Sequence, residues 1–111
     1  MNIYSLYDSK AQTFGAIAVF ENDDIAIRVI GESIARAKDT PPAKYPSDFS
    51  IMRLGTWDND KGITFVTKEC VCTMIEALST VARYGRENAR YFAELYREFE
   101  SQENKENENE N

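Results

Sequence analysis

The sequence predicts an α+β domain in which a small, mostly antiparallel sheet of three or four strands accompanies one short helix and one long C-terminal helix. Three patterns predict this fold: apolar alternation near the start, two strand-like runs around a polar turn, and helical apolar spacing through the last third. With 111 residues, of which 42% are apolar, the chain has room for one domain, residues 1–100, and a tail, residues 101–111.

The first strand is expected at residues 2–7. Side chains such as Ile3, Ser5 and Tyr7 alternate with their neighbours there, and isoleucine and tyrosine favour strands. The apolar run at 14–20 predicts either a strand or a buried extended loop, and its periodicity does not decide between the two.

A short helix is expected at residues 23–38. Asn22 or Asp23 supplies an N-cap, and the acidic first turn suits the helix dipole. Apolar residues follow at helical spacing, and the proline-rich segment 40–46 ends the helix and forms a stiff connector.

A hairpin is expected next, with strands at 48–56 and 63–67 and a turn at 57–62. The turn contains the sequence Asp-Asn-Asp-Lys-Gly at 58–62, which is similar to a calcium loop. However, its glycine stands at the fifth position rather than the sixth and no helix precedes it, so a polar turn is the simpler interpretation.

The long helix is expected at about residues 68–100, where apolar residues repeat on one broad face. At 1.5 Å per residue it is roughly 45 Å long, more than a small globule can cover. We therefore expect a homodimer formed through this face, the alternative being a helix that bends back at Gly85. The expected interface residues are Leu78, Ala82, Gly85, Ala89, Phe92 and Tyr96.

The net charge of −6 is unevenly distributed. Residues 98–111 hold six glutamates and one lysine and carry −5, so residues 1–97 carry only −1. Because residues 101–111 contain no apolar side chain, they are expected to be disordered. Such a tail either keeps the protein in solution or competes with nucleic acid for a basic surface.

Enzymatic chemistry is not expected. The chain has no histidine, no glycine-rich phosphate loop and no outstanding carboxylate pair. Cys70 and Cys72, its two cysteines, are too few for a zinc site and are expected to remain thiols in a reducing compartment. No cofactor, metal, secretory signal or membrane-spanning segment is expected.

Basic and aromatic side chains on the long helix form the candidate binding site. Four arginines fall within about 60° of one another on the helical wheel, and two tyrosines lie on the adjoining flank. Arginine binds phosphates and aromatic rings stack on unpaired bases. The candidate nucleic-acid-binding residues are Arg83, Arg86, Arg90, Arg97, Tyr84 and Tyr91.

Two other interpretations of these side chains stay open. Glu87 and Glu94 share the arginine face and could pair with it as an ordinary salt-bridged surface. On the sheet, Trp57, Phe65 and Tyr4 could form a second stacking platform, although core packing is the simpler role for most of them.

Residues 1–67 resemble the small non-structural protein of gokushoviruses, a microvirus subfamily of single-stranded DNA phages. The most specific motif is Arg-Leu-Gly-Thr-Trp-Asp at 53–58, followed by Gly62. The region 14–20 lacks the prolines that are usual in that family. The resemblance implies a protein absent from the mature virion that acts in genome replication or packaging, with DNA binding as its activity.

The expected function is therefore a non-structural phage protein that binds single-stranded DNA as a dimer in the host bacterial cytoplasm. The alternative is a protein-interaction module that binds a host replication or defence factor. An acidic tail and an exposed apolar helix face would suit either function.

Overall fold

The computed structural model describes residues 1–110, with side chains as far as Glu103, and it confirms the predicted α+β class. The strands are β1 (Asn2–Asp8), β2 (Thr13–Phe14), β3 (Ala18–Phe20), β4 (Phe49–Asp58) and β5 (Gly62–Thr73). The helices are α1 (Asp23–Arg36), the single turns α2 (Pro41–Lys44) and η1 (Pro46–Asp48), and α3 (Met74–Glu110).

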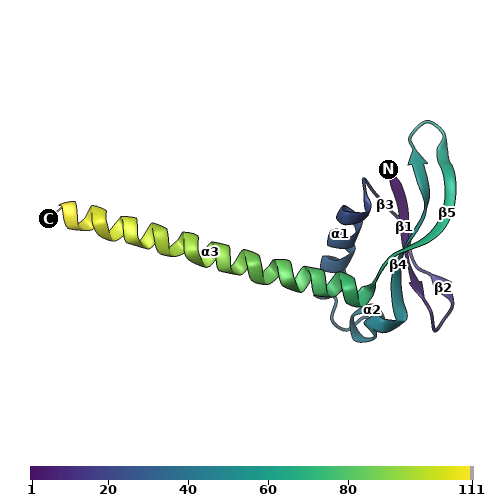
Figure 1. Cartoon of the computed structure of the whole chain (residues 1–111), viewed down its shortest axis with the longest axis horizontal. Coiled ribbons are helices and arrows are strands. Elements are labelled where there is room, and N and C mark those ends of the chain that lie inside the picture. The colour runs from purple at the N-terminus through teal and green to yellow at the C-terminus, as the bar shows by residue number, and fades with distance from the viewer. Residues whose placement is uncertain (111) are drawn as a thin grey trace. The chain divides into compact units, whose positions relative to one another are not determined.

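All five strands belong to one antiparallel sheet, one strand more than the upper limit predicted (Figure 1). The strand order is β2-β1-β4-β5, and β3 also pairs with β1. β1 pairs along its whole length with β4, from Asn2 opposite Thr56 to Asp8 opposite Phe49. The predicted first strand is therefore central in the sheet, which explains why Ile3, Tyr4 and Ser5 are buried.

The apolar run at 14–20 forms two short strands on the same edge of β1, separated by an irregular segment at 15–17. The Gly15 amide still donates to the carbonyl of Leu6 at 2.8 Å, and the Ser5 hydroxyl donates to the Gly15 carbonyl at 2.9 Å. The strand interpretation is confirmed at the two ends of the run, which pair with β1, whereas the loop between them is exposed and not buried as the alternative predicted.

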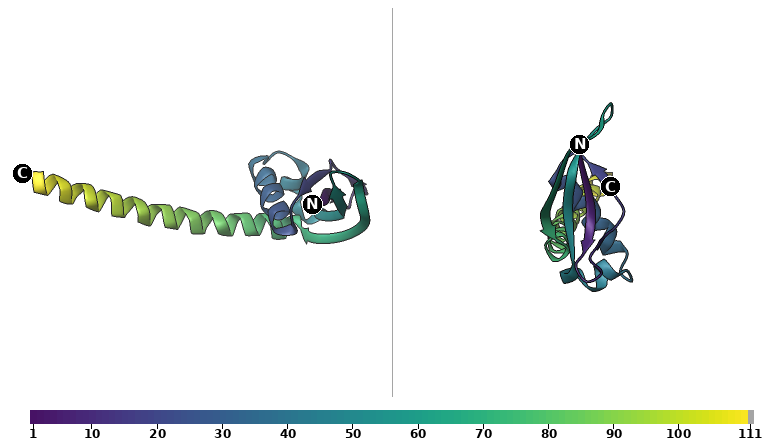
Figure 2. Two further views of the ribbon diagram at one scale, coloured as in Figure 1. Left: turned by 90° about the horizontal axis from the view of Figure 1, so that it is seen from above. Right: turned by 90° about the vertical axis from the view of Figure 1, so that its right-hand side faces the viewer.

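The β4–β5 hairpin has the predicted turn but longer arms. Asp58 Oδ1 accepts from the backbone amides of Asp60 and Lys61, and Gly62 has a φ of +78°. The turn needs glycine there because other residues rarely adopt that backbone conformation. The hairpin tip extends beyond the end of β1 (Figure 2).

One apolar core lies between the sheet and two helices, α1 and the first turns of α3. Asn22 caps α1, since its side chain accepts from the Ile25 amide at 2.9 Å. A Cβ on Gly31 of α1 would meet Val81 Cγ2 at 2.8 Å, so the helices approach closely at this glycine. The core residues are Tyr4, Ala26, Phe49, Ile51, Cys72, Met74 and Ala77.

A polar cluster ties the start of α1 to the sheet. The Tyr4 hydroxyl donates to Asp23 at 2.5 Å, and Arg53 forms ion pairs with Asp23 and Glu69. Burial alone would raise the pKa of Asp23, but the hydrogen bonds from Tyr4 and Arg53 outweigh it and lower that pKa. Arg53 therefore has a structural role across β4, β5 and α1.

The long helix begins at Met74, not near residue 68 as predicted. Residues 68–73 instead continue β5 and pair with β4 as far as Thr73 opposite Ser50. The Thr73 hydroxyl accepts from the Glu76 amide at 3.2 Å and so caps the helix. The helical spacing of apolar residues predicted too early a start because β5 pairs with β4 through register shifts, which break the strict alternation expected of a strand.

The helix also continues to Glu110, through the segment where the sequence predicted disorder. Glutamate, glutamine and lysine are good helix formers, so a started helix can extend through them. Asn111 lies outside the described residues. The chain divides into two units, Met1–Val81 and Ala82–Asn111, and α3 contributes to both.

Candidate nucleic-acid interface

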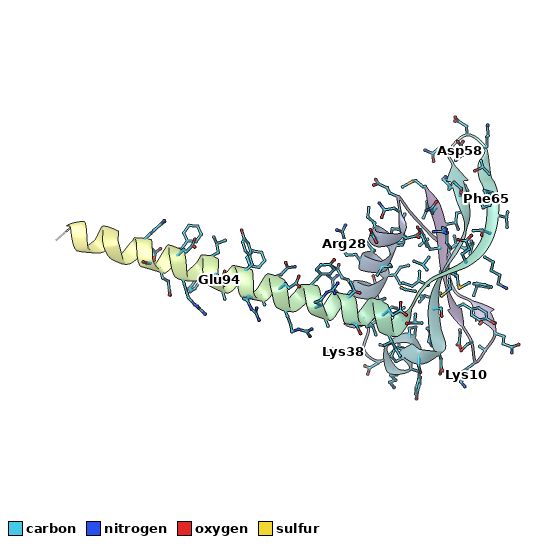
Figure 3. The ribbon with its side chains drawn as sticks, viewed as in Figure 1. Lys10, Arg28, Lys38, Asp58, Phe65 and Glu94 are labelled. Carbon is cyan, nitrogen blue, oxygen red and sulfur yellow. The ribbon has the colours of Figure 1, made fainter. Side chains whose placement is uncertain are left out.

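The candidate site lies in the second unit, on residues 82–103 of α3. This segment is rich in alanine, arginine and glutamate, which favour helix, and contains no proline. Except for Leu95, every side chain from Ala82 to Glu103 is exposed. Figure 3 shows these side chains as sticks along the helix, with Glu94 labelled. The side chains of this segment are therefore accessible to a ligand.

The four predicted arginines are all exposed on this helix. With about 100° between successive residues they fall within roughly 60°, so they form one stripe along the helix. We call Arg83, Arg86, Arg90 and Arg97 the arginine stripe.

The alternative interpretation of this surface required pairing between the arginines and Glu87 or Glu94. Within the part of the chain whose side chains are described, the ion pairs are those of Arg53 with Asp23 and Glu69. The arginine stripe has no carboxylate within 4.0 Å there. Its guanidinium groups are therefore available to a ligand, although the two glutamates still lower the local positive charge.

The two predicted tyrosines flank the stripe and are exposed. The Arg83 guanidinium lies 5.4 Å from the centroid of the Tyr84 ring. Tyr91 packs edge-on against Phe92 at a centroid distance of 5.5 Å. A guanidinium group and an aromatic ring are thus adjacent on one helix surface, which is a combination found in single-strand binding sites.

Charge along the helix changes sign. Residues 82–90 hold three arginines and one glutamate, a net +2, whereas residues 91–103 hold one arginine and four glutamates, a net −3. Attraction for a polyanion is therefore strongest at the N-terminal half of this segment.

The predicted dimer residues lie at two kinds of position. Leu78 belongs to the first unit, where it packs against the core cluster. The other five, Ala82, Gly85, Ala89, Phe92 and Tyr96, are exposed. α3 is one continuous helix through Gly85, and a Cβ there would meet no described atom within 4 Å other than the neighbouring backbone of the helix itself.

The second stacking platform is only partly available. Tyr4 is completely buried and belongs to the core, whereas Trp57 and Phe65 are exposed on the β4–β5 hairpin, where Phe65 is labelled in Figure 3. Sequence reasoning did not single out Ile63 and Val66, which are also exposed on this hairpin. The sequence signal that could have identified them is the position of these apolar residues directly after the polar turn at 58–62.

The remaining sequence predictions concern the two cysteines, possible metal ligands and possible membrane-spanning segments. Cys70 is exposed and Cys72 is buried, and burial raises the pKa of the Cys72 thiol to about 11. No group of three or more cysteine, aspartate or glutamate side chains in the described part is placed to hold a metal ion. Nor does any described helix combine the length and apolar character needed to cross a bilayer.

Comparison with known sequences finds relatives of this chain among phage proteins. The family model described as Phage ORF5 protein matches residues 1–77. Protein ORF5 of Chlamydia phage 1 is 30% identical over 80 residues, which cover 69% of this chain and 83% of that protein. No solved structure matches the chain. The family match covers the sheet, α1 and the first turn of α3, and it ends before the arginine stripe.

Proposed function

Because this chain belongs to the Phage ORF5 protein family, we propose that it is a non-structural phage protein that binds single-stranded DNA during genome replication or packaging. The observation that carries the proposal is the arginine stripe, which is exposed, adjoins two exposed tyrosines and has no carboxylate within 4.0 Å among the side chains described up to Glu103. The protein would act in the host bacterial cytoplasm, where the phage genome is copied.

The proposed binding combines two kinds of contact along one helix, with phosphates and with bases. Guanidinium groups bind phosphates and release counterions from the nucleic acid. Tyr84 and Tyr91 offer ring faces on which unpaired bases can stack, an interaction worth about 1–3 kcal/mol per base. Stacking accepts any base, so we expect little sequence preference and stronger binding to single strands than to duplex.

Dimerisation is part of the proposal because the net charge of −6 opposes binding to any polyanion. One stripe of four arginines is a small positive surface. Two stripes in a homodimer would engage one strand together, and the second contact would then be intramolecular. The exposed aromatic residues Phe92, Tyr96 and Phe99, which lie on a different face of the helix from the stripe, provide a surface for that dimer.

The direct test is fluorescence anisotropy with a labelled single-stranded oligonucleotide at about 50 and 200 mM salt. Each phosphate contact contributes about −0.7 to the slope of log K against log salt for single strands. One stripe would therefore give a slope near about −3, and two stripes a slope approaching about −6. Absence of binding at 50 mM salt would contradict the proposal.

A charge-reversal pair tests whether the arginine stripe is the site. Arg83→Glu with Arg90→Glu should weaken binding at least tenfold, because two phosphate contacts become repulsive. Arg28→Glu with Arg36→Glu is the matched control, since both residues are exposed on α1 and the change in net charge is the same. Equal losses in the two variants would show that only overall charge matters.

The alternative function, a module that binds a host protein, is favoured by a different observation. Ile63, Phe65 and Val66 are exposed on β5, which pairs with β4 on one side only. Protein partners commonly cover such apolar edges. If the anisotropy experiment shows no DNA binding, the next comparison is the wild type against the Phe65→Ser, Val66→Ser variant in pull-downs from host lysate. A partner lost only by the variant would support this function.

A further inference from the structure

Six side chains of the second unit repeat along α3 with alternating spacings of three and four residues. This is the heptad spacing of a coiled-coil seam. The first three residues are small and the last three are large and aromatic. The seam consists of Ala82, Gly85, Ala89, Phe92, Tyr96 and Phe99.

We propose that two copies of this seam pair antiparallel, so that each small residue of one chain faces an aromatic residue of the other. In this register Ala82 faces the partner's Phe99, Gly85 faces the partner's Tyr96, and Ala89 faces the partner's Phe92. In heptad terms, Ala82, Ala89 and Tyr96 occupy a positions and Gly85, Phe92 and Phe99 occupy d positions. The register pairs each a position with a d position of the partner, which is the usual arrangement in antiparallel coiled coils. The inference rests on the homodimer of the proposed function and adds its geometry.

Packing favours this direction. Paired helices keep a nearly constant distance of about 8–10 Å between their axes, so each layer needs a similar side-chain volume. In a parallel pair Gly85 would meet its own copy and leave a gap, while Phe92 and Tyr96 would each meet their own copies and force the helices apart. The antiparallel register combines one small and one large residue in every layer.

Charge favours the same direction. Residues 82–90 carry +2 and residues 91–103 carry −3. An antiparallel pair places the positive half of each helix beside the negative half of the other, whereas a parallel pair places like charges together. The difference in energy is largest at low salt, because exposed charges are screened beyond about 10 Å at 0.1 M.

The exposed aromatic surface is large enough for such an interface. Phe92, Tyr96 and Phe99 are 63%, 66% and 59% exposed. Since a buried aromatic covers about 150–250 Å², these three leave roughly 300–450 Å² per chain, or about 600–900 Å² for the pair. Adjoining side chains such as Leu95 bring the total toward the roughly 1,000 Å² of a specific interface.

The seam leaves the other surfaces of α3 free. Its centre lies about 120° around the helix from the arginine stripe, so DNA and a second copy would contact different faces. The seam also begins after Leu78, which packs against the core of the first unit. The antiparallel register needs only residues 82–99, all within the second unit.

Spin-label distances in the full-length dimer test the direction. Cys70→Ser removes the exposed thiol, and Cys72 can remain because it is buried. One label is then placed at Ser101→Cys, and a matched control label at Glu87→Cys. Both positions are exposed and lie on the outer side of the helix, away from the seam. Sedimentation at the labelling concentration first establishes whether the protein is a dimer.

The two directions give clearly different results. With 1.5 Å per residue, antiparallel pairing separates the two Ser101 labels by about 35 Å and the two Glu87 labels by about 20 Å. A parallel pair gives about 20 Å at both positions. A short Ser101 distance overturns the antiparallel register, and a monomer in sedimentation overturns the dimer itself. Anisotropy on the same samples reports DNA binding separately, so failure of the pairing and failure of the proposed activity are distinguishable.

Discussion

At the scale of single residues, two glycines show how backbone contacts outside the local sequence determine a residue's role. Gly55 is buried in β4, and a Cβ there would lie 2.2 Å from the carbonyl oxygen of Phe65 on β5. Because that atom belongs to the backbone of the paired strand, it cannot move without breaking the ladder. Gly85 on α3 has open space around it.

Gly55→Ala is therefore expected to destabilise the fold by about 3 kcal/mol, at the upper end of typical overpacking costs. Urea unfolding followed by tryptophan fluorescence would measure the change through Trp57. Gly85→Ala is the matched control at a protein concentration too low for dimerisation, and it should leave the midpoint unchanged or raise it, since alanine favours helix over glycine. A Gly55→Ala variant as stable as wild type would disprove the close contact.

At the scale of elements, the junction between β5 and α3 joins the two parts of the fold. Cys72 and Met74 are both buried in the core, although Cys72 is the last residue but one of a strand and Met74 is the first residue of a helix. The strand therefore passes directly into the helix without a loop. Thr73 stands between them, and its hydroxyl supplies the acceptor that the first turn of the helix needs.

Removing that acceptor should cost about 1 kcal/mol, the typical price of losing an N-cap. Thr73→Ala is the variant, and urea unfolding measures the loss. Thr80→Ala serves as control, because the Thr80 hydroxyl only donates to the carbonyl of Glu76 one turn earlier, a bond that adds little to helix stability. Equal stability of the two variants would place the start of the helix elsewhere.

At the scale of the whole molecule, charge is distributed against the proposed activity. The arginine stripe is a local positive surface in a chain of net charge −6, and residues 101–111 carry −3 of that charge. Because residues 101–110 continue the helix rather than fold back over the arginines, this polyanionic segment would act by repelling an incoming strand.

Deleting residues 101–111 should therefore tighten single-stranded DNA binding at least threefold at about 50 mM salt, with a smaller effect at about 200 mM because salt screens the repulsion. Anisotropy titration compares the two proteins. A full-length variant with Glu103, Glu106, Glu108 and Glu110 changed to glutamine should behave like the deletion. Unchanged affinity in both would remove the tail from any role in DNA binding.

The sequence by itself determined the fold class, α1, the hairpin turn and most of the long helix, whereas the binding role of the candidate residues stays a prediction. These features depend on short-range periodicity, capping and turn chemistry, which neighbouring residues encode. The resemblance drawn from residues 1–67 was likewise confirmed by the Phage ORF5 protein match. The site itself could be placed on one helix face because helical geometry needs no tertiary information.

Only the tertiary structure decided where β5 ends, how 14–20 is divided, and which aromatic residues are buried. Residues 68–73 suit a helix or a bulged strand, and pairing with β4 selects the strand. Tyr4 is buried while Phe65 is exposed, although both are strand aromatics, because β1 is central in the sheet and β5 is at its edge. Position in a sheet depends on contacts between distant segments, which local patterns do not encode.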